Sequence, residues 1–144
     1  MDSITIEKIL WKGKGKTLFK GWFPCDKLFP PNQFPSAIIV NEDPTNKPGS
    51  HWVCLYFKDK GEVYYFDSFG REPIIQIKKF INNFDKVSYN SRCFQTILSE
   101  TCAHYCIFFI HSIANGSTIN EIIKRLSNHP NSDHYVYKYV KCIS

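Results

Sequence analysis

Long apolar runs are missing from this sequence of 144 residues. No stretch approaches the roughly 18 consecutive apolar residues that a membrane-spanning helix needs. The first residues, Met1 to Glu7, have neither the basic start nor the apolar stretch of a secretory signal. We therefore expect a protein that is not secreted and that has no membrane partner.

Internal repeats and low-complexity tracts are also absent, and the length suits one domain spanning residues 1–144. The six cysteines include no Cys-x-x-Cys pair and show no regular spacing, which argues against a disulfide scaffold or a zinc knuckle. In the absence of a secretory signal we expect reduced thiols that are buried or catalytic. Apolar residues make up 43% of the chain and charged residues 22%, as in ordinary globular proteins.

Hydrophobic periodicity and turn residues predict the order of the elements. From the N-terminus they are a helix over 3–10, a proline-rich irregular segment over 22–35, a buried strand over 36–41, a loop over 43–50, a hairpin with strands 51–58 and 62–68, a helix over 73–84, a strand over 86–95, an apolar helix over 102–115 ended by Gly116, a helix from the capping box at 118–121 to about 127, and a helix over 133–142. This order predicts an α+β fold, with a small mixed or antiparallel sheet packed on a buried central helix.

Among the cysteines, Cys102 is the strongest candidate for a nucleophile. It lies where the polar stretch 99–101 gives way to the apolar helix. The unpaired N–H groups and the dipole at a helix N-terminus favour a thiolate, which is the reactive form of cysteine. Cys106 would lie one turn deeper in the helix, away from that terminus.

The predicted hairpin supplies partners for this thiol. His51 opens its first strand and Asp67 lies at the end of the second, so the antiparallel pairing brings the two residues close together. An imidazole serves as a general base, and a neighbouring carboxylate orients it and stabilises its charged form. Gln95 ends the strand before Cys102, and its amide is suited to donate to an oxyanion together with the Cys102 N–H.

These residues resemble the motif series of the adenovirus-type cysteine proteases. The resemblance rests on Gly-Ser-His-Trp at 49–52, Tyr-Phe-Asp-Ser-Phe-Gly at 65–70, Gln95 seven residues before Cys102, and the helix end at 109–115. Related enzymes occur in large DNA viruses, virophages and Polinton/Maverick elements, and the proteases of ubiquitin-like proteins belong to the same clan. The order His, Asp or Glu, Gln, Cys is that of the clan.

The resemblance implies a maturation protease that cuts capsid precursors of a virus or mobile element after glycine, within a glycine-rich site. It implies action in the virion and in the infected cell, either in the nucleus or in a cytoplasmic virus factory. It also makes Trp52 and Ala103 candidates for the substrate groove. Ala103 stands where the family usually has glycine, so its Cβ is expected to narrow the groove.

The chemistry itself requires no cofactor, but the family suggests a DNA or peptide activator. The net charge is +5, and the basic segment over residues 1–21 offers a DNA contact. The lysines concerned are Lys8, Lys12, Lys14, Lys16 and Lys20. The alternative for this segment is an ordinary solvated surface.

Three other functions remain open from the sequence. The same four residues would serve a protease for ubiquitin or a ubiquitin-like modifier, since these substrates also end in glycine. A catalytically inactive nucleic-acid-binding or interaction module is a second alternative. The third is a zinc site, for which Cys93, Cys102, Cys106 and His111 are poorly spaced, so we expect no bound metal.

Overall fold

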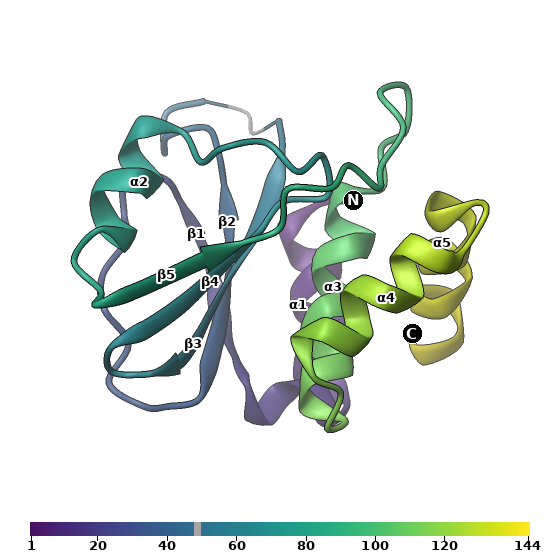
Figure 1. The fold of residues 1–144 in the computed structure, drawn as a ribbon, viewed down its shortest axis with the longest axis horizontal. Helices are drawn as coiled ribbons and strands as arrows, with labels where there is room; N and C mark the ends of the chain where they lie inside the picture. The colour runs from purple at the N-terminus through teal and green to yellow at the C-terminus, as the bar shows by residue number, and fades with distance from the viewer. Residues whose placement is uncertain (48–49) are drawn as a thin grey trace.

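The computed structural model describes residues 1–47 and 50–144, and a five-stranded mixed sheet forms the centre of the fold (Figure 1). The strands lie side by side in sequence order. Two outer pairs, β1–β2 and β4–β5, are parallel, whereas β2–β3 and β3–β4 are antiparallel. The strands are β1 (Phe19–Pro24), β2 (Ser36–Asn41), β3 (Trp52–Asp59), β4 (Glu62–Phe66) and β5 (Lys86–Tyr89).

Helices cover both faces of this sheet (Figure 1). One face packs against α2, and the other packs against α3 and α1, with α4 and α5 on the far side of α3. The α+β fold with a buried central helix is therefore confirmed. The helices are α1 (Ser3–Lys12), the short 3-10 turn η1 (Lys14–Thr17), α2 (Ile75–Ile81), α3 (Cys102–Ala114), α4 (Ile119–Asn128) and α5 (Ser132–Ile143).

The central helix α3 is buried on nearly all sides, as its apolar sequence predicts. Its Phe109 ring stacks on Phe66, with ring centroids 4.7 Å apart, and on Tyr64, at 5.8 Å. A buried phenylalanine of this kind stabilises a fold by about 1.5–3 kcal/mol. These contacts hold the helix against β4, so the start of α3 has a set position relative to the end of that strand.

Strand β1 was not predicted. The segment contains Gly21 and Pro24, which normally argue against a strand, and the prolines further along indicated an irregular connection over 22–35. The structure accommodates both residues because β1 is an edge strand. Gly21 has a φ of 128° and lies where the register with β2 shifts between Phe19 and Trp22.

The predicted strand over 86–95 was too long. β5 ends at Tyr89, and the side chain of the next residue, Asn90, is buried and bonded to the backbone of Asp67, the residue that follows β4. Helix α2 is likewise shorter than its predicted span of 73–84. The capping box that opens α4, with Thr118 and Glu121 bonded reciprocally, is confirmed.

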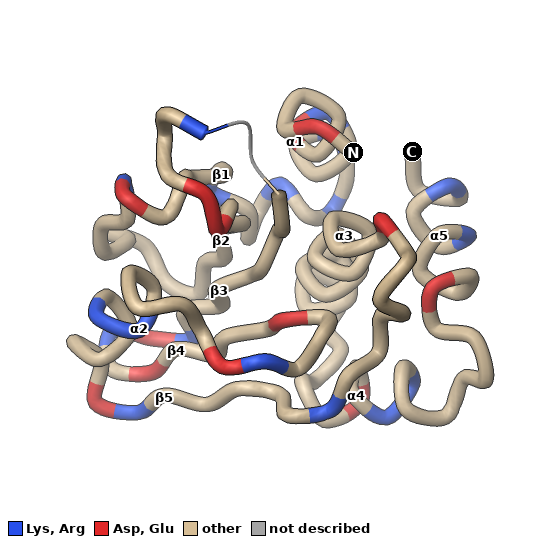
Figure 2. The backbone as a smooth tube through the Cα atoms, turned by 90° about the horizontal axis from the view of Figure 1, so that it is seen from above, with Lys and Arg blue, Asp and Glu red and all other residues tan. Residues whose placement is uncertain are grey.

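Charged residues are spread over the surface. Figure 2 shows Lys and Arg on α1, α2, α4 and α5 rather than on a single face. None of the described helices is long and apolar enough to cross a bilayer.

Candidate active site

The two ends of the β3–β4 hairpin carry His51 and Asp67. His51 directly precedes β3 and Asp67 directly follows β4. The His51 Nε2 donates to Asp67 Oδ1 at 2.6 Å, and the two residues are only 7% and 1% exposed. The predicted proximity of these two residues is therefore present in the structure, and it leaves Nδ1 as the ring nitrogen available to a second group.

Asp67 lies in a set of donors that favours its ionised form. Its carboxylate also accepts the backbone N–H groups of Phe69 and Arg71, each at 3.1 Å. Burial raises the pKa of the carboxyl, but the hydrogen bond and charge of His51 and these two N–H groups outweigh burial and hold the pKa below its ordinary 3.8. A negative charge is thus maintained beside His51.

Asn90, the residue that follows β5, supports Asp67, a role that was not predicted from the sequence. Its Oδ1 accepts the Asp67 N–H at 3.0 Å and its Nδ2 donates to the Asp67 carbonyl at 2.6 Å. Asn90 is 5% exposed. The predicted strand over 86–95 placed Asn90 in its interior, and a single polar residue there does not indicate a supporting role.

Gly70 allows the turn after Asp67 to pack closely. Its φ is +67°, a left-handed conformation that side chains disfavour. A Cβ at this position would lie 2.6 Å from the carbonyl group of Arg92 and 2.8 Å from the Ser91 oxygen. The same turn presents Phe69, whose ring stacks on the His51 imidazole at a centroid distance of 4.9 Å. The motif at 67–70 therefore positions the imidazole from two sides.

Cys102 is the first residue of α3, and it lines the same cavity as His51, which interacts with its thiol. Burial raises the pKa of the thiol, but the His51 bond, the backbone N–H groups of Trp52 and Ala103 and the His51 charge together hold the pKa below its ordinary 9.0. Burial alone would lower the pKa of His51, and its bonds to Asp67 and Cys102 raise that pKa from 6.5 to about 9. Both directions favour a thiolate–imidazolium pair at neutral pH.

The neighbouring buried thiols have the opposite property. Burial raises the pKa of Cys106 well above 9.0, with further contributions from Cys54 and Cys102. Burial also raises the pKa of Cys54. Cys106 is 1% exposed and packs in the core between α3 and the sheet. The geometry thus favours Cys102 over Cys106 as the nucleophile.

Gln95 lies in the segment between β5 and α3 rather than at the end of a strand. Ser68 Oγ donates to its Oε1 at 2.5 Å, and its Nε2 donates to the Ser99 carbonyl at 2.8 Å. These bonds orient the amide, whose Nε2 carries a second N–H. Gln95 and Cys102 line the same cavity. Ser68, which the sequence did not single out, therefore fixes the orientation of the amide: it binds Oε1 and leaves Nε2 free to donate elsewhere.

This cavity has a volume of about 420 Å³. A second cavity of about 500 Å³ shares Trp52 with it, and Trp52 packs edge-on against Trp22 at 5.6 Å. Ala103 requires a correction: it is 1% exposed and belongs to the core, so its side chain does not line the cavity. The 420 Å³ cavity is lined by Met1, Ser50, His51, Trp52, Phe69, Arg71, Gln95, Ser99, Glu100 and Cys102.

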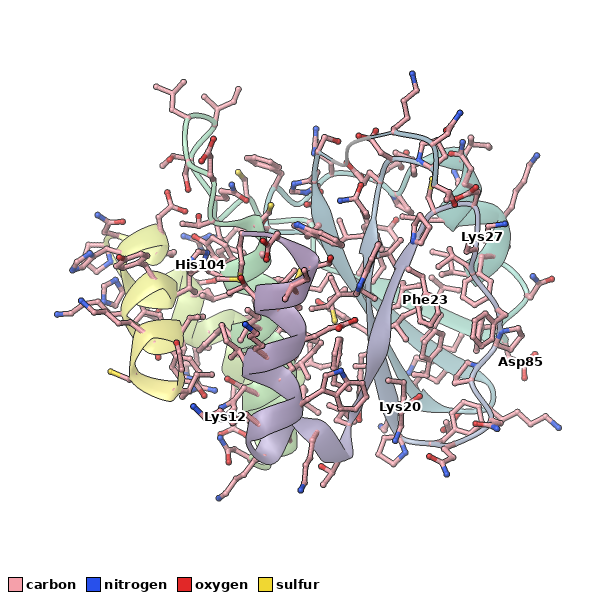
Figure 3. The ribbon with its side chains drawn as sticks, turned by 180° about the vertical axis from the view of Figure 1, so that it is seen from behind. Lys12, Lys20, Phe23, Lys27, Asp85 and His104 are labelled. Carbon is pink, nitrogen blue, oxygen red and sulfur yellow. The ribbon has the colours of Figure 1, made fainter. Side chains whose placement is uncertain are left out.

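The remaining sequence candidates lie elsewhere. Figure 3 shows Lys12 of α1 and Lys20 of β1 toward the end of the molecule opposite the start of α3. Within residues 1–47 and 50–144, no cluster of three or more His, Cys, Asp and Glu side chains is placed to hold a metal ion. His111 instead bonds Tyr139, at 2.6 Å. Gly49, the first residue of the Gly-Ser-His-Trp motif, falls outside the described residues.

No protein-family model matches the chain. Two curated relatives do. One is a thiol protease by name, from Acanthamoeba polyphaga mimivirus, and is 31% identical over 103 residues. The other is the protease of Bovine adenovirus C serotype 10, which is 28% identical over 109 residues. The chain is similar in sequence to these two viral proteases.

The aligned regions cover 63% and 62% of this chain, and 34% and 56% of the two viral relatives. The chain thus spans about a third and about half of the lengths of these proteins. In fold it matches the crystal structure of the ASFV protease, with a TM-score of 0.66 and 16% identity over 96% of this chain and 65% of that one. The central domain of a Legionella pneumophila protein shares the fold at a TM-score of 0.53 and 12% identity, over 100% of this chain and 98% of that one.

Proposed function

We propose that the chain is a cysteine endopeptidase with Cys102 as nucleophile, His51 as acid and base, Asp67 as the group that orients His51, and Gln95 as an oxyanion donor. The arrangement that supports this most directly is the buried His51–Asp67 pair, joined at 2.6 Å, in the same cavity as a thiol at the first position of a helix. The names of the two viral relatives agree with it.

The chemistry follows from these positions. The Cys102 thiolate adds to the carbonyl carbon of the scissile peptide, and the carbonyl oxygen takes up the negative charge. The free N–H of Gln95 and the Cys102 N–H, which has no helical partner at that position, stabilise this oxyanion. His51 then gives its proton to the leaving amine as the C–N bond breaks, and a thioester remains on Cys102.

Hydrolysis of the thioester uses the same groups in reverse order. Neutral His51 takes a proton from water, the resulting hydroxide adds to the thioester carbonyl, and the thiolate leaves as the acid product forms. Asp67 stabilises the imidazolium at each stage and keeps its own negative charge. Apart from water, the bond-making and bond-breaking steps therefore use only groups of this chain.

The substrate is proposed to be a capsid precursor of a virus or mobile element, cut after glycine within a glycine-rich site. Three large side chains line the cavity that holds Cys102, namely Trp52, Phe69 and Arg71. They should obstruct a substrate residue with a side chain more than they obstruct glycine, which has no Cβ. The enzyme is proposed to act in the infected cell and in the virion. DNA or a peptide as activator, with DNA held by the N-terminal lysines, stays a proposal from the family resemblance.

The test is cleavage of fluorogenic peptides with a central Gly-Gly or Gly-Ala-Gly by the purified chain. We expect turnover that Cys102→Ala abolishes and Gln95→Ala slows by about a hundredfold, the usual effect of losing one oxyanion donor. Cys106→Ala, which removes a thiol from the same helix, is the matched control and should keep activity. Loss of activity in Cys106→Ala but not in Cys102→Ala would overturn the assignment.

The ubiquitin-like alternative is separated in the same assay. Fusions of ubiquitin or a ubiquitin-like modifier replace the glycine-rich capsid peptides, with Cys102→Ala again as the blank. Turnover of the fusions alone would replace the capsid proposal while keeping the four catalytic assignments.

A further inference from the structure

The segment between β5 and α3 exposes two large apolar side chains. Ile97 is 88% exposed and Leu98 is 93% exposed, whereas the next most exposed large apolar residue in the described part of the chain, Ile4, is 62% exposed. Figure 1 shows this segment projecting from the body of the molecule at the end where α3 begins. We name residues 96–101 the tip loop.

Both ends of the tip loop are attached to one residue of α5, Asp133. Its Oδ2 accepts from the backbone N–H and the hydroxyl of Thr96, at 3.2 and 2.8 Å. Its Oδ1 accepts from the hydroxyls of Thr101, at 3.0 Å, and Tyr105, at 2.8 Å. Within the loop, the Ser99 N–H donates to the Thr96 carbonyl at 3.1 Å. The apolar pair is therefore displayed on a braced loop.

The base of this loop is part of the candidate active site. Ser99 and Glu100 line the cavity that holds Cys102, and Gln95 bonds the Ser99 carbonyl. Leu98 is four residues from Cys102, so their Cα atoms lie within about 14 Å of each other. A substrate in an extended conformation covers that distance with about four residues. The apolar pair is thus within reach of the residues that flank a scissile bond.

We propose that Ile97 and Leu98 form a substrate-docking surface, which binds apolar side chains within about four residues of the cleavage site. The proposal rests on the proposed protease function, and it assigns specificity to side chains outside the glycine positions. The occupant is the polypeptide substrate because the loop is continuous with the cavity around Cys102. Bracing by Asp133 reduces the ordering cost of binding.

The experiment measures peptide binding apart from cleavage. The Cys102→Ala variant, which holds peptide uncut, is titrated with two fluorescein-labelled 12-residue peptides with a central Gly-Gly. One peptide has Leu at the third and fourth positions on both sides of the glycines, and the other has Ser there. We expect the Leu peptide to bind about ten- to a hundredfold more tightly by fluorescence anisotropy, the effect of burying one or two aliphatic side chains.

The double substitution Ile97→Ser/Leu98→Ser should remove this preference. The affinity for the Ser peptide should stay unchanged, and it serves as the reference. Ile75→Ser, which changes a 60% exposed apolar residue on α2, is the matched control and should keep it. Equal affinity of the two peptides, or a preference that survives the double substitution, overturns the proposal. So does self-association in sedimentation that the double substitution abolishes, since a second copy would then be the occupant.

Failure of the protease function gives a different result. In that case the chain with Cys102 present cleaves neither peptide, while the anisotropy difference is still measured in the Cys102→Ala background. The two outcomes are therefore read separately.

Discussion

The charge on Asp67 should determine how readily Cys102 ionises. Asp67→Asn keeps the size of the side chain but removes the carboxylate that accepts from His51 Nε2 at 2.6 Å. The imidazolium then loses its charged partner in a site where both residues are buried. Because the interaction with His51 lowers the pKa of Cys102, the change at Asp67 should appear at the thiol.

The magnitude follows from the contact that is lost. A hydrogen bond to a charged group contributes about 1.5–3 kcal/mol, and one pKa unit corresponds to about 1.4 kcal/mol. The pKa of His51, about 9 in the structure, should therefore fall by about one to two units in Asp67→Asn. The thiolate–imidazolium pair becomes less favourable by the same free energy. The pH at which Cys102 forms its thiolate should therefore rise by up to about one to two units.

The assay is the rate of alkylation by iodoacetamide from about pH 4 to about pH 10, on both sides of the ordinary pKa of a thiol, with the labelled cysteine identified by mass. Cys93 and Cys142 are exposed and free, and they serve as references on the same chain. A midpoint for Cys102 that is unchanged in Asp67→Asn would refute the reasoning. A midpoint in the unmodified chain equal to that of Cys93 and Cys142 would refute the ion pair itself.

The remaining predictions concern the support of this pair. Gly70→Ala should lower the free energy of unfolding by at least about 1–3 kcal/mol, because its Cβ meets the Arg92 carbonyl group at 2.6 Å and its φ is +67°; thermal unfolding that matches the unmodified chain would contradict this. Asn90→Ala should lower the free energy of unfolding, measured with urea, by about 1–3 kcal/mol, because it leaves the buried N–H and carbonyl of Asp67 without their partners. For pH, the lowered pKa of Asp67 adds stability that is present above 3.8 and lost as pH falls through the folded pKa. The raised pKa of His51 adds stability that is present below pH 6.5 and lost as pH rises through about 9. The pair should therefore stabilise the fold most between pH 3.8 and pH 6.5. Equal melting temperatures of the unmodified chain and Asp67→Asn in that range would count against this.

Several parts of the site were predictable because they depend on local pattern. The β-branched and aromatic residues over 51–58 and 62–68, separated by a turn signal at 59–61, indicated a hairpin. An antiparallel hairpin brings His51 and Asp67 together whatever surrounds it. The change from polar residues 99–101 to an apolar stretch indicated a helix beginning at Cys102. These are short-range properties, so the sequence carries them without reference to the rest of the fold.

Other parts were not predictable because they depend on packing between distant segments. Strand β1 contains Gly21 and Pro24, and only its position at the sheet edge makes them acceptable. The inward orientation of Ala103 depends on which side of α3 meets the core. The family resemblance made Ala103 a groove candidate, whereas the structure places it in the core.

By itself the sequence determined the α+β class, the hairpin, the start of the central helix and the choice of Cys102 with His51 and Asp67 as candidates. Only the tertiary structure decided which groups support them. Asn90 bonds Asp67 from the position just after β5, Ser68 orients Gln95, and Asp133 of α5 braces the loop between Gln95 and Cys102. Such hydrogen bonds join residues 23 to 37 positions apart, and no periodicity in the chain encodes a contact of that range. They follow from how the sheet and helices pack, which sets the distances that the chemistry requires.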